Sequence, residues 1–257
     1  MIAVGVEPNP MVSTGDIRAG TSQPGGHAEQ RYRDLRAKQR RRMRPVTGTL
    51  IAMSFLLAIW GFARTDWMTS VPLFLGGGLF ATGLALRDLM PHPIQKWGDG
   101  AEAERDTARR LARLPEPLWH VWHDLATKYG NLDHLVVGPA GVFVMDTKAW
   151  WGQSLTFEDR QPVLRARHQP ERGNRWAKVP ASAGASAAAQ SRALRSLIGA
   201  SIRVTPVVVA WADTERVATE TGGVTYVRGD AVDQWLLDLH PVLSPETVAR
   251  IVTAVGR

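Results

Sequence analysis

Residues 131–152 most constrain the fold, because they contain two short apolar runs separated by four turn-forming residues. Residues 132–137 and 142–147 are both rich in valine, and the sequence Gly-Pro-Ala-Gly at 138–141 joins them. Runs of this length and composition around such a turn predict a β-hairpin of two buried strands.

Charged residues interrupt this otherwise apolar hairpin. Because side chains two positions apart share one face of a strand, Val144, Asp146 and Lys148 line one side of the second strand. Asp133 shares its side of the first strand with Leu135, and antiparallel pairing can bring it close to Asp146. Two neighbouring carboxylates repel each other unless a cation or a proton lies between them. The pattern predicts a divalent metal site with a lysine beside it.

Four motifs stand in order along this region: Asn-Leu-Asp-His at 131–134, Gly-Pro-Ala-Gly-Val-Phe at 138–143, Asp-Thr-Lys at 146–148 and Trp-Gly at 151–152. This series resembles the nuclease-related domain (NERD) of the PD-(D/E)XK nuclease superfamily. The resemblance covers about residues 96–211. It implies an α/β fold with a restriction-endonuclease-like αβββαβ core, in which helices flank a mixed sheet.

The resemblance also implies a catalytic site. Asp133 and Asp146 would hold Mg²⁺ or Mn²⁺, the backbone carbonyl of Thr147 would complete the shell, and Lys148 would orient or activate the attacking water. Glu104 would support this metal ion or a second one. The implied reaction is hydrolysis of phosphodiester bonds in nucleic acid, with DNA favoured over RNA and the oligomeric state left open.

Two helices accompany the hairpin in the sequence. Residues 99–114 have helical spacing, and Glu104 lies on the apolar stripe, where a carboxylate needs a partner. Ala103 precedes it where the family has glycine. Residues 180–198 are rich in alanine, the best helix former, and Gln190 shares a stripe with Leu194. Gln190 resembles a glutamine that supports the site in such nucleases; an ordinary surface glutamine is the alternative.

The remaining elements of the soluble domain, residues 96–257, follow from local patterns. Strands are predicted at 118–123, 153–158, 161–164, 202–211 and 224–227, and helices at 231–239 and 245–255, with Ser244 as an N-cap. His120 and His123 are predicted to point to opposite faces, so they cannot easily share a metal ion. His134 is predicted to face away from Asp133. His120 and His123 are expected to be structural or surface residues, and His134 is expected to pack or to support the site from behind rather than to bind a metal ion.

A basic and aromatic stretch follows the hairpin. Its members are Arg165, Arg167, Arg172, Arg175, Trp176 and Lys178. Such a stretch could hold a phosphate backbone and stack a base. A solvated loop explains the same composition, and the sequence leaves both interpretations open.

The charge is unevenly distributed. The chain carries a net charge of +7 and no cysteine, which excludes disulfides, thiolate metal sites and cysteine catalysis. Residues 29–44 hold most of the excess, at +6, whereas residues 96–257 carry only +2. The basic segment is therefore expected to attract anionic lipid head groups rather than nucleic acid.

Two apolar runs, at 46–63 and 68–86, are near the minimum length of roughly 17 residues for a membrane span. They predict two transmembrane helices, with buried core helices as the alternative. The positive-inside rule then places both termini in the cytoplasm, with the chain in the cell membrane. Residues 1–28 have a composition typical of a disordered tail.

Together these patterns predict a membrane-anchored, cytoplasm-facing, Mg²⁺-dependent nuclease. Two alternatives remain: a nucleic-acid-binding module that cuts little or nothing, and a membrane-linked scaffold. The glycine clusters lack the following Lys-Ser/Thr of a phosphate-binding loop, so a nucleotide-driven enzyme is not expected.

Overall fold

The computed structural model describes residues 17–18, 25–64, 92–127, 130–166, 177–179, 182–199 and 201–256. The chain forms two compact units. One unit is Ala28–Asp99, and the other combines Met1–His27 with Gly100–Arg257. The predicted nuclease site falls in the second unit.

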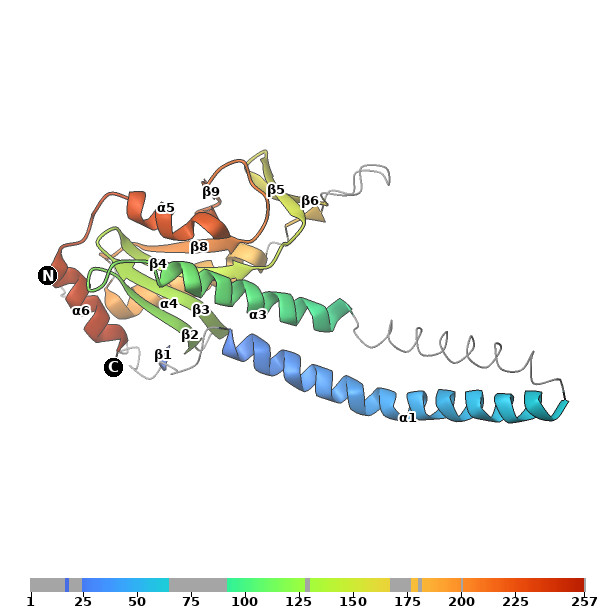
Figure 1. Ribbon diagram of the computed structural model, residues 1–257. Helices are drawn as coiled ribbons and strands as arrows, with labels where there is room; N and C mark the ends of the chain where they lie inside the picture. Colours follow the sequence, from blue (N-terminus) through green and yellow to red (C-terminus); the bar gives the residue numbers. More distant parts are fainter. Residues whose placement is uncertain are drawn as a thin grey trace, which may run out of the picture. The chain divides into compact units, whose positions relative to one another are not determined.

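In the first unit, α1 (Gly26–Arg64) is a continuous helix that covers both the basic segment and the first apolar run (Figure 1). Met53, Phe55, Leu56 and Ile59 of α1 have side chains that are each more than half exposed. Among the residues that the structure describes, no helix combines the length and the apolar character needed to cross a membrane. The second apolar run, at 68–86, lies outside the described residues, so the transmembrane hairpin stays a prediction.

The second unit has a mixed α/β fold (Figure 1). Its strands are β1 (Ile17–Arg18), β2 (His120–Thr127), β3 (Gly130–Gly138), β4 (Gly141–Lys148), β5 (Gln153–Glu158), β6 (Gln161–Ala166), β7 (Ala177–Lys178), β8 (Val204–Ala210), β9 (Ala218–Thr221) and β10 (Val224–Arg228). Its helices are α3 (His92–Leu111, whose start belongs to the first unit), α4 (Ser182–Ile198), α5 (Val232–Asp238) and α6 (Pro245–Val255). The 3-10 turn η2 (Gly229–Ala231) leads into α5.

The main sheet has the strand order β1-β2-β3-β4-β8-β10-β9. β4, β8 and β10 run parallel to one another, and the other neighbours are antiparallel. A smaller sheet contains β5, β6 and β7 in that order. The parallel arrangement places the carboxyl ends of β4, β8 and β10 at one edge of the main sheet, where ligands bind in open α/β sheets.

The hairpin between β3 and β4 confirms the prediction for residues 132–147. Its last pair is Gly138 opposite Gly141, so Pro139 and Ala140 form the turn. Gly141 has φ 138°, a value that side chains rarely allow. A Cβ on Gly138 would lie 2.2 Å from the Trp119 ring, so only glycine lets this indole pack on the strand.

Helices cover both faces of the main sheet. The strand side chains that pack with α4 and α6 are Leu135, Val137, Val142 and Val144. Those that pack with α3 and α5 are Val136, Phe143, Met145, Val207 and Val209. Valine-rich strands buried on both faces are typical of the parallel part of such a sheet.

The structure differs from the sequence prediction at several elements. Ile17 and Arg18 pair with Thr127 and Ala126 of β2, so the predicted disorder of residues 1–28 is wrong for these two residues. Their backbone forms an edge ladder although the neighbouring sequence is polar. β9 was not predicted, because its sequence Ala-Thr-Glu-Thr has no apolar run. α3 begins seven residues before the predicted start at residue 99. The N-cap of α6 is as predicted, since Ser244 Oγ accepts from Thr247 N at 3.3 Å.

Candidate functional site

The site forms where β3 and β4 separate. Their ladder ends at the pair His134 and Met145, and beyond it the Thr147 N–H donates to Asp133 Oδ2 at 2.7 Å. The carboxylate therefore takes the place of a strand carbonyl. In a strand, the N–H and C=O of one residue face the same neighbour, so the Thr147 carbonyl also faces Asp133.

Asp146 lies at the centre of the site. Its residue exposure is only 8%, and its Oδ1 accepts from Lys148 Nζ at 2.8 Å. Its Oδ2 is buried and has no hydrogen bond of normal geometry. Burial raises the pKa of Asp146, and the charge and hydrogen bond of Lys148, together with the nearby Asp133 carboxyl, oppose that increase.

Glu104 reaches this group from α3. Burial of the Glu104 carboxyl raises its pKa to about 7, and the charges of Asp124 and Asp146 add to the increase. Burial also raises the pKa of Asp133 well above its usual range, and Glu104 and Asp146 act in the same direction. Glu104, Asp133 and Asp146 thus lie close enough for the charge of Asp146 to raise the pKa values of the other two.

Gln190 holds the strand that carries Asp133. It is buried, and its Nε2 donates to the carbonyl of Asn131 at 2.8 Å. The bond ties α4 to β3 two residues before Asp133. Gln190 therefore faces the sheet next to the site. The sequence predicted this orientation, because Gln190 shares one helical stripe with Leu194.

The oxygen atoms of this cluster suit a hard cation. Within the described ranges, no group of three or more histidine or acidic side chains is arranged to hold a metal ion alone. Mg²⁺ does not need such a group, because it is usually bound by one or two carboxylates, waters and substrate phosphates. The buried, unpaired Oδ2 of Asp146 and the raised pKa values of three carboxyl groups mark excess negative charge that a cation would neutralise.

Asp124 belongs to this cluster and was missed in the sequence. It is 6% exposed, has φ 54°, and accepts a hydrogen bond from Asn131 Nδ2. Its charge contributes to the raised pKa of Glu104. Tyr226 was missed too: burial and the charge of Asp146 raise the pKa of its hydroxyl. Both residues lie inside ordinary strand patterns, so no local signal separates them from structural residues.

The histidines form contacts of their own. His120 stacks on Trp122, whereas His123 Nδ1 lies 2.7 Å from His134 Nδ1. His134 is fully buried, and burial together with His123 lowers its pKa well below the usual range. His120 and His123 thus have different partners, and the partner of His123 is the buried His134.

Most of the predicted basic and aromatic stretch lies outside the described residues, which include none of Arg167, Arg172, Arg175 and Trp176. Arg165 lies on β6 and pairs with Glu158 across the small sheet. Lys178 belongs to β7, opposite Val163. The structure therefore places Arg165 in a surface pair of the small sheet and does not bring it into the carboxylate cluster.

Comparison with known proteins finds a family match for part of the chain. Residues 99–211 of the chain match the model of a protein family. It is the nuclease-related domain, NERD. The matched segment contains all of the predicted carboxylates, Lys148 and Gln190, so the resemblance to NERD is confirmed over these residues.

An uncharacterized protein of Bacillus anthracis is 32% identical to the chain over 79 residues. The alignment covers 29% of this chain and 37% of that relative, so the chain spans little more than a third of the relative's length. No solved structure matches the chain. The description of the matched family is thus nuclease-related.

Proposed function

We propose that the chain is a metal-dependent nuclease that hydrolyses phosphodiester bonds in nucleic acid, with DNA as the favoured substrate. The observation that carries this proposal is the pairing of Lys148 with Asp146 at 2.8 Å beside the Asp133 carboxylate. The NERD match supports it.

The residues have separate roles in this proposal. Asp133, Asp146 and the Thr147 carbonyl would hold Mg²⁺ or Mn²⁺, and Glu104 would assist them. Such an ion, when bound, supplies Lewis acidity and lowers the pKa of a bound water. Lys148, which is partly exposed beside Asp146, orients the attacking water and offsets charge on the phosphate. Gln190 keeps Asp133 in position through the backbone of β3.

The test uses the purified full-length chain with single-stranded and duplex DNA and RNA, in Mg²⁺, Mn²⁺ or EDTA. We expect cutting that needs the metal and that Asp146→Ala and Lys148→Ala each abolish. Asp238→Asn is the matched control, because Asp238 is an exposed carboxylate on α5 that bonds Gln234. Cutting that survives in EDTA or in both site variants would overturn the proposal.

Metal binding has a readout that does not depend on cutting. An ion that binds the folded state alone raises the midpoint of thermal unfolding by mass action. We expect Mg²⁺ to raise this midpoint in the wild type and in Asp238→Asn, but not in Asp146→Ala. A folded chain that binds metal and nucleic acid without cutting would instead be a binding module.

Association with a membrane through residues 29–86 is a further part of the proposal. The exposed side chains of Met53, Phe55, Leu56 and Ile59 on α1 support it, since exposed apolar patches mark interaction surfaces. The cytoplasmic orientation rests on the basic residues of 29–44 alone. If the full-length chain, expressed in a bacterium, stays in the supernatant after ultracentrifugation without detergent, this part is wrong.

A further inference from the structure

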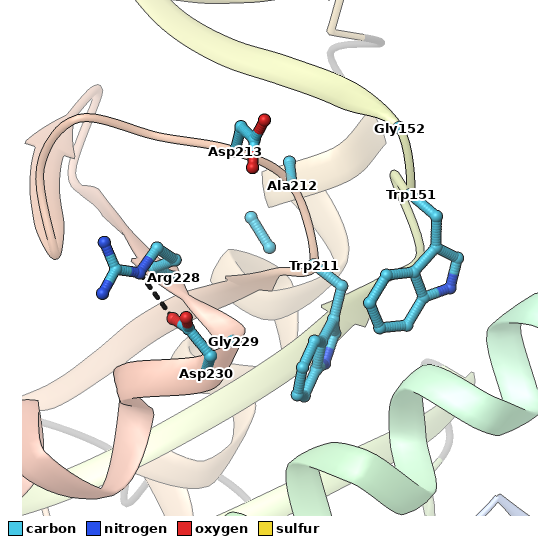
Figure 2. Close-up of a pocket in the computed structure, with 9 residues that line it drawn as sticks. Trp151, Gly152, Trp211, Ala212, Asp213, Arg228, Gly229 and Asp230 are labelled. Atoms are coloured by element: carbon cyan, nitrogen blue, oxygen red, sulfur yellow. Dashed lines mark hydrogen bonds and ion pairs between the residues drawn. The ribbon is translucent and has the colours of Figure 1, made fainter. Parts of the chain in front are cut away.

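A pocket of about 310 Å³ lies beside the carboxylate site, at the carboxyl ends of the three parallel strands (Figure 2). Trp151 and Gly152 follow β4, Trp211, Ala212 and Asp213 follow β8, and Gly229 and Asp230 follow β10. The same strand β4 carries Asp146 and Lys148, and Trp211 N donates to the Lys148 carbonyl at 3.0 Å. The pocket therefore begins at the end of the strand that carries Lys148.

Two tryptophans form one wall of this pocket. The Trp151 and Trp211 rings lie side by side, with centroids 5.0 Å apart (Figure 2). Trp211 is fixed, because its Nε1 donates to Thr107 Oγ1 at 2.9 Å and a Cβ on Gly229 would lie 2.6 Å from its ring. Trp151 is 43% exposed, which is unusual for so large an apolar side chain. An exposed ring braced by a fixed one is a ready surface for stacking.

The opposite wall is polar. Arg228 Nε donates to Asp230 Oδ1 at 2.5 Å. Figure 2 shows both residues across the pocket from the two tryptophans. The ion pair with Asp230 is made through Nε, and Figure 2 shows the two terminal nitrogens of Arg228 pointing away from that carboxylate. They can donate to a phosphate oxygen, while Asp230 offers an acceptor for a base N–H.

The size of the pocket limits the ligand. About 310 Å³ is near the lower end of ligand pockets, which hold roughly 300–1,000 Å³, and suits one nucleotide rather than a duplex. Inside a duplex both faces of a base are covered by its neighbours, and a terminal base pair is too large for a pocket that suits one nucleotide, so the tryptophan can stack only on an unpaired base.

We propose that the pocket of Trp151, Trp211, Arg228 and Asp230 binds the base of one unpaired nucleotide next to the bond that is cut. The chain would then select single strands or single-stranded ends. This inference rests on the proposed nuclease function and names its substrate class.

The experiment measures binding of the full-length chain to labelled DNA by fluorescence anisotropy, with Ca²⁺ in place of Mg²⁺ to prevent cutting. Base stacking on an aromatic contributes roughly 1–3 kcal/mol, so we expect Trp151→Ala to weaken binding of a single strand at least about fivefold. Binding of a blunt duplex should not change. Trp151→Phe should retain most of the affinity, because a smaller ring still stacks. Trp97→Ala is the matched control, since Trp97 is 39% exposed and lies on α3, in the other compact unit.

A second measurement needs no variant and so does not depend on the folding of Trp151→Ala. One nucleotide at a time is replaced by an abasic site in the single strand, and wild-type binding should weaken at one position only. Equal binding at every abasic position, or equal losses for single strand and duplex in Trp151→Ala, would overturn the inference. A free nucleoside monophosphate that competes as strongly as the single strand would also overturn the inference, because the ligand would then be a free nucleotide. If the wild type neither binds nor cuts nucleic acid, the proposed function itself fails.

Discussion

At the scale of single residues, the site combines four carboxyl groups, those of Glu104, Asp124, Asp133 and Asp146, with one nearby lysine that pairs with Asp146. Burial raises the pKa values of Glu104, Asp133 and Asp146, and the charge of Asp146 adds to the increase at Glu104 and Asp133. The charged forms of these three groups are therefore stabilised less in the fold than in the unfolded chain. The site therefore favours bound protons or a cation at neutral pH.

Glu104 allows a direct test of this balance. Its pKa is about 7 in the folded chain against an ordinary value of 4.5, so between these values the folded state binds a proton that the unfolded state has lost. The free energy of unfolding therefore falls as the pH rises from 4.5 to about 7. We expect Glu104→Gln to remove up to about 3 kcal/mol of this fall.

The measurement is urea unfolding at several pH values in EDTA. Glu102→Gln is the matched control, because Glu102 is exposed on the same helix. An unchanged pH dependence in Glu104→Gln would show that the pKa of Glu104 is not raised in the folded chain.

At the scale of elements, the patterns that predict structure are those with a local cause. The hairpin formed where the two valine-rich runs predicted it, and α4 formed where the helix propensity of alanine predicted it. α6 begins after Ser244, the predicted N-cap. β1 and β9 were missed because two and four mostly polar residues give no periodic signal. The site carboxylates were found through motif spacing, whereas Asp124 and the tryptophan pocket depend on which strands become neighbours. That order is set by packing of distant segments, which local patterns do not contain.

The turn between β3 and β4 gives a prediction about packing. Gly138→Ala places a methyl group where the Trp119 ring lies, at 2.2 Å, so ring or strand must shift. We expect the free energy of unfolding to fall by about 1–3 kcal/mol, as for other overpacked cores. Chemical denaturation measures this change.

Gly100→Ala is its control on α3. A Cβ there meets no atom within 4 Å, so alanine should stabilise the helix by roughly 0.5–1 kcal/mol. Equal effects of the two substitutions would argue against the close contact at Trp119.

The tie between α4 and β3 gives another prediction. Gln190→Leu leaves the Asn131 carbonyl without its 2.8 Å donor, which should cost about 1–3 kcal/mol of stability. If the bond positions Asp133, the Mg²⁺-induced rise in unfolding midpoint should shrink as well. Gln234→Leu, at an exposed position on α5, should change neither quantity by a comparable amount.

At the scale of the whole molecule, the basic segment and the first apolar run lie on α1, whereas the sheet and the carboxylates lie in the other compact unit. In the part of the chain that the structure describes, β1 is the only strand before residue 92, and it contributes two residues to the edge of the main sheet.

A chain that starts at residue 92 should therefore fold and cut like the full-length protein. We expect its midpoint of thermal unfolding to lie within about 5 °C of the corresponding full-length transition, since losing a two-residue edge strand removes on the order of 1 kcal/mol. Differential scanning calorimetry measures this. Loss of a cooperative transition would show that the sheet depends on residues 1–91.

The parallel order of β4, β8 and β10 has a consequence for engineering. The residues proposed for cutting sit in or against buried strands, whereas those proposed to hold the base lie at the ends of β4, β8 and β10 and in the connections that follow them. Connections on a rigid sheet tolerate substitution better than its core does. Substrate choice could thus be redesigned at the exposed Trp151 and at 212–213, while Trp211 and Gly229, which pack against each other, and the reaction chemistry are kept.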